Sequence, residues 1–350
     1  MVTNATLEGN TPLDCPKYSL EALIAYDAFL FWCEGIAGST ISVLGIVGNI
    51  ITAFILSRSG MRNNFNWLLA SLAVYDTTYL MAAFIDNFRW QFHLVSYTHM
   101  IFPYFLHPLQ STAMTGSILM MLGIAWERVL VTHYHRNVNL KWCLALVFII
   151  SVLINVHKFF ETRLLFDSNE AITWLQVTEL RTDPISSIVT NWMLAIVIGF
   201  IPFILLILLN IQVYIDTTKS REAASSPSTA RQKHDTHLAS IMVVYVTVFL
   251  LSHFFCITLN IHELATFGFV RKCLRGGQNG FPLWAFYVAA ISHLMLAVKS
   301  SANLIIYAAM SPKFRNEMRV TFRSLCSNKS VTNSSLPNTE DGTEMVTFNC

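Results

Sequence analysis

The stretch PYFLHPLQSTAMTGSILMMLGIAWERVLVTH, residues 103–133, decides the fold. It is mostly apolar and ends close to the charged pair Glu127 and Arg128. At about 1.5 Å per residue, a helix of this length exceeds the roughly 30 Å of hydrocarbon in a bilayer, so it is expected to tilt and to run past one membrane face. Gln110, Ser117 and Arg128 lie at three depths along it. This helix is therefore expected to form the middle of a bundle and to contact both of its ends.

The composition of the whole chain has the same apolar character. Of the 350 residues, 54% are hydrophobic and 13% are charged, and the mean hydropathy is +0.50, which leaves too little polar surface for a soluble globular protein. Backbone polar groups in lipid must be satisfied within each segment, so apolar runs of spanning length are helices. The sequence therefore predicts an all-α fold, a seven-transmembrane helix bundle. The expected spans are residues 28–56, 65–88, 100–131, 140–160, 188–215, 238–259 and 283–309.

The distribution of basic residues predicts the orientation of the bundle. Most of the 23 Lys and Arg residues fall in alternate loops and in the C-terminal tail, and such loops stay in the cytoplasm. This predicts a multi-pass protein of the plasma membrane with an extracellular N-terminus, where the sequon at Asn4 can be glycosylated. The expected organisation is an extracellular segment over residues 1–27, the bundle over 28–310, a juxtamembrane helix over 311–326 and a flexible cytoplasmic tail over 327–350.

The juxtamembrane segment has the pattern of an amphipathic helix. Its apolar side chains recur at helical spacing, with Lys and Arg on the other faces. A cytoplasmic helix of this kind lies in the membrane interface and contacts lipid. Cys326 directly follows it, where palmitoylation is expected. The apolar residues are Phe314, Met318, Phe322 and Leu325.

Few polar side chains lie within the spans. Asn49, Asp76, Ser117 and Lys299 are placed at bilayer depth, where an ionisable group costs about 2.5–3.5 kcal/mol on insertion scales. Each such group therefore needs a partner or a function. One acid and one base predict an ion pair between Asp76 and Lys299. The alternative is that Lys299 extends toward one membrane face.

Four polar motifs occur in a fixed order along the chain. They are Gly48-Asn49 in the first span, Leu72-Ala73 followed by Asp76 in the second, Glu127-Arg128 ending the third, and Asn303 with Tyr307 ending the seventh. Over residues 48–314 this set resembles the rhodopsin-like G-protein-coupled receptors. NVHKFFE at residues 155–161 and SHLMLAVKSSANLIIYAAMSPKFR at residues 292–315 resemble the invertebrate FMRFamide-type neuropeptide receptors. The resemblance implies an extracellular peptide ligand, short, amidated and RFamide-like, and a heterotrimeric G protein as partner.

The resemblance also implies positions for the ligand. Gln110 lies on the pocket-facing side of the third helix, where receptors for small amines carry an aspartate, and a neutral amide favours a ligand recognised by hydrogen bonds. The alternative is that Gln110 bonds a neighbouring helix. Glu161, Glu263 and Asp86 are the acids expected to bind a ligand guanidinium, although each can also be a solvated charge.

An activation switch is implied at the inner end of the third helix. Arg128 is expected to pair with Glu127 and Asp235 at rest, which holds the sixth helix inward until an agonist shifts the population. The alternative is that Asp235 is a solvated loop residue. The remaining switch residues implied by the resemblance are Phe249, Asn303 and Tyr307.

Three departures from the family pattern change these expectations. Lys299 stands where related receptors carry an Asn that helps to bind sodium, so its ammonium is expected to replace that ion. Residue 103 is proline where the usual disulfide cysteine stands, and residues 162–187 lack cysteine, so Cys15 and Cys273 remain as the expected outer pair. The sixth helix lacks its usual proline and Leu304 replaces that of the seventh, so smaller kinks are expected.

Other classes of function fit this sequence less well. A chemosensory or orphan receptor of the same fold is the near alternative. A seven-helix transporter or channel would need charged residues along a pathway, and only Asp76 and Lys299 form a charged layer in mid-membrane. No metal-ligand spacing, nucleophile triad or basic-aromatic run occurs, so no enzyme activity, metal, cofactor or nucleic-acid partner is expected.

Overall fold

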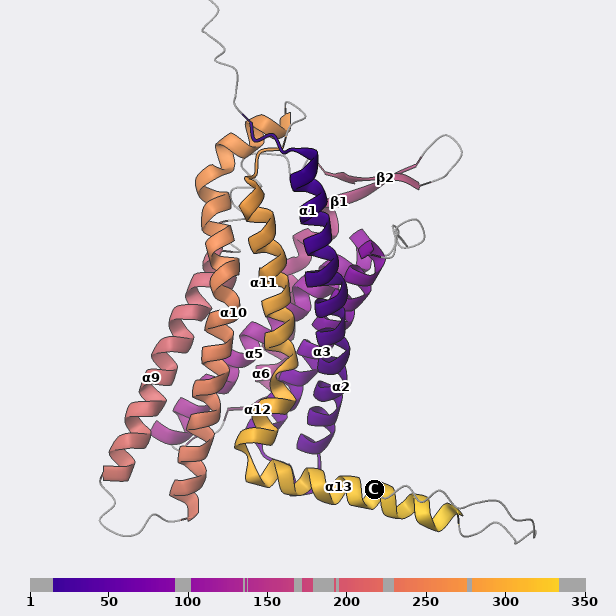
Figure 1. Ribbon diagram of the computed structural model, residues 1–350. Coiled ribbons are helices and arrows are strands. Elements are labelled where there is room, and N and C mark those ends of the chain that lie inside the picture. The colour runs from indigo at the N-terminus through magenta and orange to yellow at the C-terminus, as the bar shows by residue number, and fades with distance from the viewer. Residues whose placement is uncertain are drawn as a thin grey trace, which may run out of the picture.

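A computed structural model describes residues 15–91, 102–134, 136, 138–166, 172–178, 192, 195–222, 230–275 and 279–333. Apart from one β-hairpin, the regular structure of these residues is helical. Seven of the helices are long and apolar enough to cross a membrane. The predicted seven-helix bundle is therefore confirmed, and the long helices run side by side from one end of the molecule to the other (Figure 1).

The spans are built from helical segments whose bounds differ from the expected ones mainly at the ends. The first span begins at Leu20 rather than at residue 28, because the hydroxyl of Ser19 accepts a hydrogen bond from the Ala22 amide and caps the helix. The helices are α1 (Leu20–Leu30), η1 (Phe31–Gly38), α2 (Ser39–Leu56), η2 (Ser59–Met61), α3 (Asn64–Gln91), η3 (Phe102–Leu106), α5 (His107–His133), α6 (Leu140–Asn155), η4 (Val156–Phe160), η5 (Ala195–Phe200), α9 (Ile201–Glu222), α10 (Ala230–Arg275), α11 (Leu283–Ser301), α12 (Asn303–Met310) and α13 (Pro312–Asn333).

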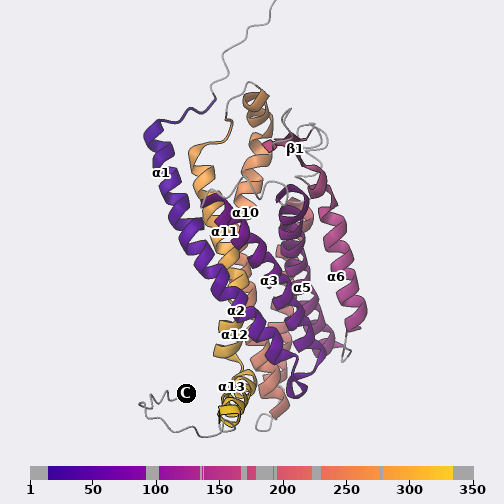
Figure 2. The same ribbon diagram turned by 90° about the vertical axis from the view of Figure 1, so that its right-hand side faces the viewer.

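The helix that was expected to lie in the middle of the bundle does so. α5 packs against α3, α6 and α9, and Figure 2 shows it between α3 and α6. Its side chains Ile118, Met120, Met121 and Ile124 are buried in the main apolar core. Close packing needs small residues here, because a Cβ on Gly116 would collide with the ring of Tyr75 on α3.

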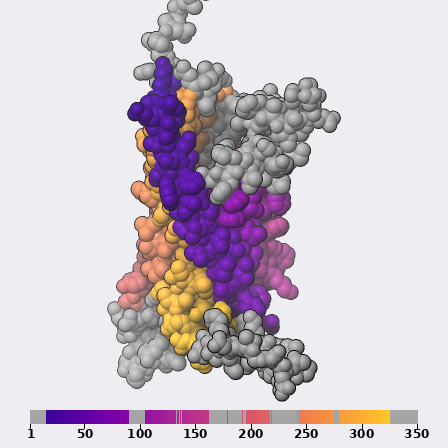
Figure 3. Space-filling model, turned by 45° about the vertical axis from the view of Figure 1, so that its right-hand side comes forward, coloured from indigo at the N-terminus to yellow at the C-terminus, as the bar shows by residue number. Residues whose placement is uncertain are grey.

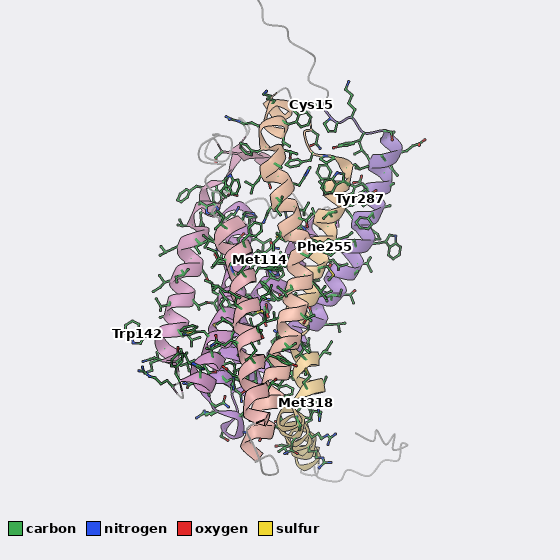
Figure 4. All side chains as sticks on the ribbon, turned by 90° about the vertical axis from the view of Figure 1, so that its left-hand side faces the viewer. Cys15, Met114, Trp142, Phe255, Tyr287 and Met318 are labelled. Atoms are coloured by element: carbon green, nitrogen blue, oxygen red, sulfur yellow. A yellow bond between two sulfur atoms is a disulfide. The ribbon has the colours of Figure 1, made fainter. Side chains whose placement is uncertain are left out.

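Large apolar side chains cover the outside of the bundle. Leu44, Trp142 and Ile305 are each about two-thirds exposed, and Figure 4 shows Trp142 pointing away from the other helices. An exposed apolar surface of this extent fits contact with lipid rather than with water. The space-filling view shows the first span crossing one face of the bundle obliquely, beside the C-terminal helices (Figure 3).

One end of the bundle carries the β-hairpin, and we call it the hairpin end. The sequence analysis did not predict the strands β1 (Thr162–Phe166) and β2 (Ile172–Val177), which pair antiparallel with Thr162 opposite Val177. Thr178 attaches the base of the hairpin to η4, because its hydroxyl donates to the carbonyl of Phe160.

The N-terminal segment is fastened to the same end. Cys15 and Cys273 form a disulfide, and the hydroxyl of Tyr18 donates to the carbonyl of Phe281. Partial burial raises the pKa of Tyr18, so this hydroxyl remains a proton donor at neutral pH. The start of α1 is thus linked to the end of α10 and to the residues that precede α11.

The opposite end carries α13, and we call it the α13 end. In Figure 1 this helix lies across the bundle. Phe314 is buried and Met318 packs against the main core, whereas Phe322 is exposed. The helix continues to Asn333, beyond the expected limit at residue 326. Its pattern is that of the expected amphipathic helix, while the side chains of Leu325 and Cys326 lie outside the described part of the chain.

The disulfide leads to a first prediction. Replacing Cys15 or Cys273 by alanine is expected to lower the free energy of unfolding by about 2–5 kcal/mol, because either change removes the same cross-link. The double variant should then be no less stable than the single ones. Thermal unfolding of the purified protein measures this, with Cys143→Ala, which removes a free cysteine, as the control. A double variant clearly less stable than both single variants would show that the two residues act separately.

Candidate functional site

A fully buried carboxylate lies at the centre of the bundle. Asp76 on α3 accepts hydrogen bonds at Oδ1 from the Lys299 ammonium at 2.9 Å and from the hydroxyls of Ser117 at 2.7 Å and Ser300 at 2.9 Å. The amide of Asn303 donates to Oδ2 at 2.8 Å. Both carboxylate oxygens are therefore satisfied, and one positive charge neutralises the negative one.

Asp76, its hydrogen-bond donors, Asn49 and Tyr245 form what we call the polar layer. Lys299 is held inside this layer and does not extend toward a membrane face. Its side chain is 7% exposed, and its ammonium also donates to the hydroxyl of Ser117. Four predicted residues, Asn49, Asp76, Ser117 and Lys299, are thus brought together. Asn49 joins through the amide of Asn303, which donates to its Oδ1 at 2.7 Å.

The polar layer connects helices that are distant in sequence. The Tyr245 hydroxyl on α10 donates to Oδ1 of Asn303 at 2.9 Å, and the Asn49 amide on α2 donates to the carbonyl of Ser300 at 2.8 Å. Rings continue the contact toward the α13 end, because Tyr307 packs against both Tyr245 and Phe314. A change at Asp76 can therefore reach α10 and α13 through side chains in direct contact.

The seventh span is interrupted inside this layer although it has no proline. α11 ends at Ser301 and α12 begins at Asn303. The hydroxyl of Ser301 donates to the carbonyls of Ala297 at 2.7 Å and of Ile41 at 3.0 Å, and back-bonding by serine bends helices. Serine and the neighbouring network thus produce the interruption that was expected to be weaker without proline, whereas α10 runs from Ala230 to Arg275 without one.

The side chain of Arg128 is buried between the polar layer and the α13 end. Its Nε is 3.4 Å from Oε2 of Glu127, and its guanidinium lies 3.5 Å from the centroid of the Phe65 ring. Phe65 begins the second span, and the sequence analysis gave it no role. The side chain of Asp235, the other expected partner of Arg128, lies outside the described part of the chain. Phe249 is buried on α10 and stacks on His253.

Toward the hairpin end, two of the acids expected to bind ligand already have cationic partners. The Glu161 carboxylate accepts hydrogen bonds from Lys158 at 2.8 and 3.0 Å, and the Asp86 carboxylate pairs with Arg89 at 2.7 Å. Each pair comes from one short segment, with partners three residues apart. These contacts restrain both carboxylates, so a ligand cation would have to share or displace an existing partner.

The other two expected ligand contacts lie on longer helices. The side chain of Gln110 on α5 lies beside Tyr79 on α3, as in the interhelical alternative given above. Glu263 is half-buried on α10. Beside them, the Asn155 amide at the end of α6 donates to the Thr115 hydroxyl on α5 at 2.9 Å, which gives the first residue of the NVHKFFE motif a structural role.

One ionic contact at this end was missed by the sequence analysis. Oε1 of Glu34 on η1 lies 2.9 Å from Nδ1 of His293 on α11. The two residues are 259 positions apart; His293 belongs to the 292–315 motif, but Glu34 belongs to none and the motif does not indicate its partner. Only the relative height and rotation of the first and seventh spans brings them together.

Comparison with known proteins agrees with the seven-helix bundle. Residues 37–324 match the model of the family described as serpentine type 7TM GPCR chemoreceptor Srw. The chain belongs to this family. Srw proteins are G-protein-coupled receptors, so the chain is a multi-pass membrane receptor, and membership implies a ligand and a G protein in general terms.

Two curated proteins are similar to this chain over most of its length. The Srw chain is 26% identical over 320 residues to the "FMRFamide receptor" of Drosophila melanogaster, covering 83% of this chain and 54% of that protein. It is 24% identical over 331 residues to the "Probable G-protein coupled receptor frpr-1" of Caenorhabditis elegans, covering 85% and 81%. The chain thus spans about half the length of the fly protein. The predicted resemblance to FMRFamide-type receptors is confirmed.

The polar layer of this Srw receptor gives a second prediction. Lys299→Asn leaves the buried Asp76 charge without its counter-ion, so we expect a loss of about 3–5 kcal/mol in the free energy of unfolding. Sodium can then supply the missing charge and should raise the unfolding temperature of this variant more than that of the wild type. The measurement compares sodium chloride with choline chloride at equal ionic strength.

The matched control removes both charges. Asp76→Asn combined with Lys299→Asn has no carboxylate for sodium, so its unfolding temperature should be the same in both salts. If sodium stabilises the wild type as strongly as Lys299→Asn, Lys299 does not replace a bound cation.

Proposed function

We propose that this protein is a plasma-membrane receptor for an extracellular neuropeptide, a short amidated peptide of the RFamide type, and that it signals through a heterotrimeric G protein. The observation that carries the proposal is its similarity, over most of its own length, to a protein named as an FMRFamide receptor. The seven-helix bundle, with a polar layer joined to both ends, supplies the machinery that such signalling needs.

The proposed orientation places the hairpin end outside the cell. A disulfide at this end fits an oxidising compartment, and it would put the sequon at Asn4, which lies outside the described residues, on the side where glycosylation occurs. At the α13 end, α13 carries Lys313, Arg315, Arg319 and Arg323, in agreement with a cytoplasmic location. Palmitoylation of Cys326 would add a second membrane anchor beside this helix.

We assign ligand binding to the hairpin end. Glu161, Glu263 and Asp86 are proposed to recognise the positive charge of the peptide, and Gln110 its amide groups. The partners Lys158 and Arg89 orient the carboxylates of Glu161 and Asp86 before a ligand arrives, and the ligand cation would share or displace them. Such pre-orientation lowers the cost of ordering on binding.

We assign G-protein coupling to the α13 end. Arg128, held by Glu127 and covered by the Phe65 ring, is proposed to be released on activation, together with its contact to Asp235. Asn303 and Tyr307 would transmit the change from the polar layer, because their side chains contact Tyr245 on α10. Phe249 lies on the same face of α10, one turn from Tyr245.

A second candidate function is favoured by the family comparison. The matching family is described as chemoreceptors, so a receptor for an environmental chemical remains the alternative to a neuropeptide receptor. The two differ in the ligand and share the proposed coupling mechanism. A ligand screen therefore separates them.

The third prediction tests the proposed function. In cells that express the full chain with a promiscuous G protein, amidated peptides ending in Arg-Phe-amide should raise intracellular calcium. Arg128→Ala should abolish the response at equal surface expression, whereas Arg136→Ala, a change in the exposed loop after α5, should keep it. A receptor that reaches the surface, ignores these peptides and responds to small chemicals would establish the chemoreceptor alternative.

The fourth prediction concerns Phe65. A cation–π contact of this kind contributes about 1 kcal/mol, which corresponds to roughly a fivefold change in the population of the active state. Phe65→Leu should therefore raise basal signalling several-fold, and Phe65→Tyr, which keeps the ring face, should not. Phe54→Leu is the control, since Arg58 lies 5.2 Å from that exposed ring. Equal basal signalling in Phe65→Leu and wild type would exclude a restraining role.

A further inference from the structure

His293 occupies an unusual position in the seventh span. It lies one helical turn from Ala297, on the same face of α11, and Ala297 is buried in a cluster with Tyr79 and Ala113 inside the bundle. His293 therefore faces the interior, yet its side chain is 65% exposed. Solvent reaches this imidazole from within the bundle, near the hairpin end.

The partner of His293 is a carboxylate held in place by close packing. Glu34 lies on η1, where the Cys33 thiol contacts the carbonyl of Ala290 on α11. A Cβ on Gly38 would lie 3.0 Å from the Asn87 amide, so η1 also packs tightly on α3. Glu34 is 19% exposed. Its carboxylate is thus fixed between the first, second and seventh spans while remaining accessible.

Two cationic groups lie near Glu34 and Asp86: the charge of Arg89 is permanent, and the charge of His293 depends on pH. Asp86 on α3 faces His293 and is paired with Arg89, which carries a permanent positive charge. The imidazole bound to Glu34 carries a charge only when protonated, and its ordinary pKa is about 6.5. Among the described residues, Tyr26, Cys33 and Tyr79 also lie near Glu34, and all three are neutral at physiological pH. With neutral His293, the group of Glu34, Asp86 and Arg89 has a net negative charge.

We propose that Glu34 binds the positively charged group of the extracellular ligand, a guanidinium, and that protonated His293 competes with it for the same carboxylate. This inference deepens the proposed function, on which it rests, by naming Glu34 as the acid that binds the guanidinium, since Glu161 and Asp86 already pair with Lys158 and Arg89. A planar guanidinium can bind a carboxylate through two parallel hydrogen bonds, which an imidazole cannot do. The ligand therefore replaces His293 readily at neutral pH and less readily in acid.

The competition predicts how the affinity for the ligand changes with pH. If one proton must leave the imidazole before the guanidinium binds, the apparent affinity falls by up to about tenfold for each pH unit below the pKa of His293, so binding should be clearly weaker at pH 5.5 than at pH 7.5. Glu34→Gln removes the charge that both cations seek, so it should weaken binding about tenfold or more and abolish the pH dependence. His293→Asn keeps a hydrogen-bond donor that never carries a charge, so it should bind at pH 5.5 as well as at pH 7.5.

The first experiment does not require the peptide to be known. Full-length receptor in lipid nanodiscs is heated with N-acetyl-arginine amide or with N-acetyl-citrulline amide, which has the same shape without the charge. The arginine compound should raise the unfolding temperature more than the citrulline compound at pH 7.5, and less so at pH 5.5. Glu34→Gln should lose this difference, while Glu21→Gln, the same change at an exposed position on α1, should retain it.

The second experiment uses Phe-Met-Arg-Phe-amide and its citrulline analogue in the calcium assay, across the same pH range and the same variants. Potency should follow the pattern of the unfolding temperatures, with His293→Asn independent of pH. If the peptide fails on the wild type, the proposed ligand is wrong, and the nanodisc experiment still decides the subsite. If Glu34→Gln keeps the preference for arginine over citrulline, Glu34 does not bind the cation and the inference is overturned.

Discussion

The structure depends on one constraint, which is that a carboxylate inside a membrane bundle must be neutralised and hydrogen-bonded. Asp76 has no exposed surface, and an unpaired buried charge costs several kcal/mol. The chain neutralises and hydrogen-bonds the Asp76 carboxylate with an ammonium, two hydroxyls and an amide from α5, α11 and α12. Because these donors come from different helices, the height and rotation of each span is restricted by its reach to one point. Most of the remaining core is apolar and less directional.

The same constraint coincides with a break in the seventh span, which contains no proline. Ser300 donates to Asp76, and Ser301 bonds back to its own helix and across to Ile41. A seventh span that must direct both donors inward is interrupted at Ala302, between α11 and α12. The interruption divides the seventh span into α11 and a short segment, α12, toward the α13 end. Rings on Tyr245, Tyr307 and Phe314 then couple that segment to its neighbours.

Sequence reasoning predicted what depends on hydropathy and on position within one helix. The spans, the amphipathic α13 and four residues of the polar layer were predicted in this way, whereas Ser300 and Tyr245 were not. The two cysteines named as a pair, Cys15 and Cys273, lie bonded. Contacts between helices were missed where a motif contains one partner and not the other, as with Phe65 under Arg128 and Glu34 beside His293. Periodicity indicates which face of a helix a residue occupies, but not the relative tilt and height of two helices.

The disulfide also imposes an order on the making of the protein. Cys15 precedes the first span and Cys273 ends the sixth, 258 residues later. During translation Cys15 emerges first, and its partner exists only after six helices have been synthesised and threaded through the membrane. The bond therefore closes almost the whole bundle into a ring as one of the last events of assembly. One wrongly inserted helix among the first six would bring the two cysteines to opposite faces, so closure of this ring reports that these six spans have crossed the membrane in the right order.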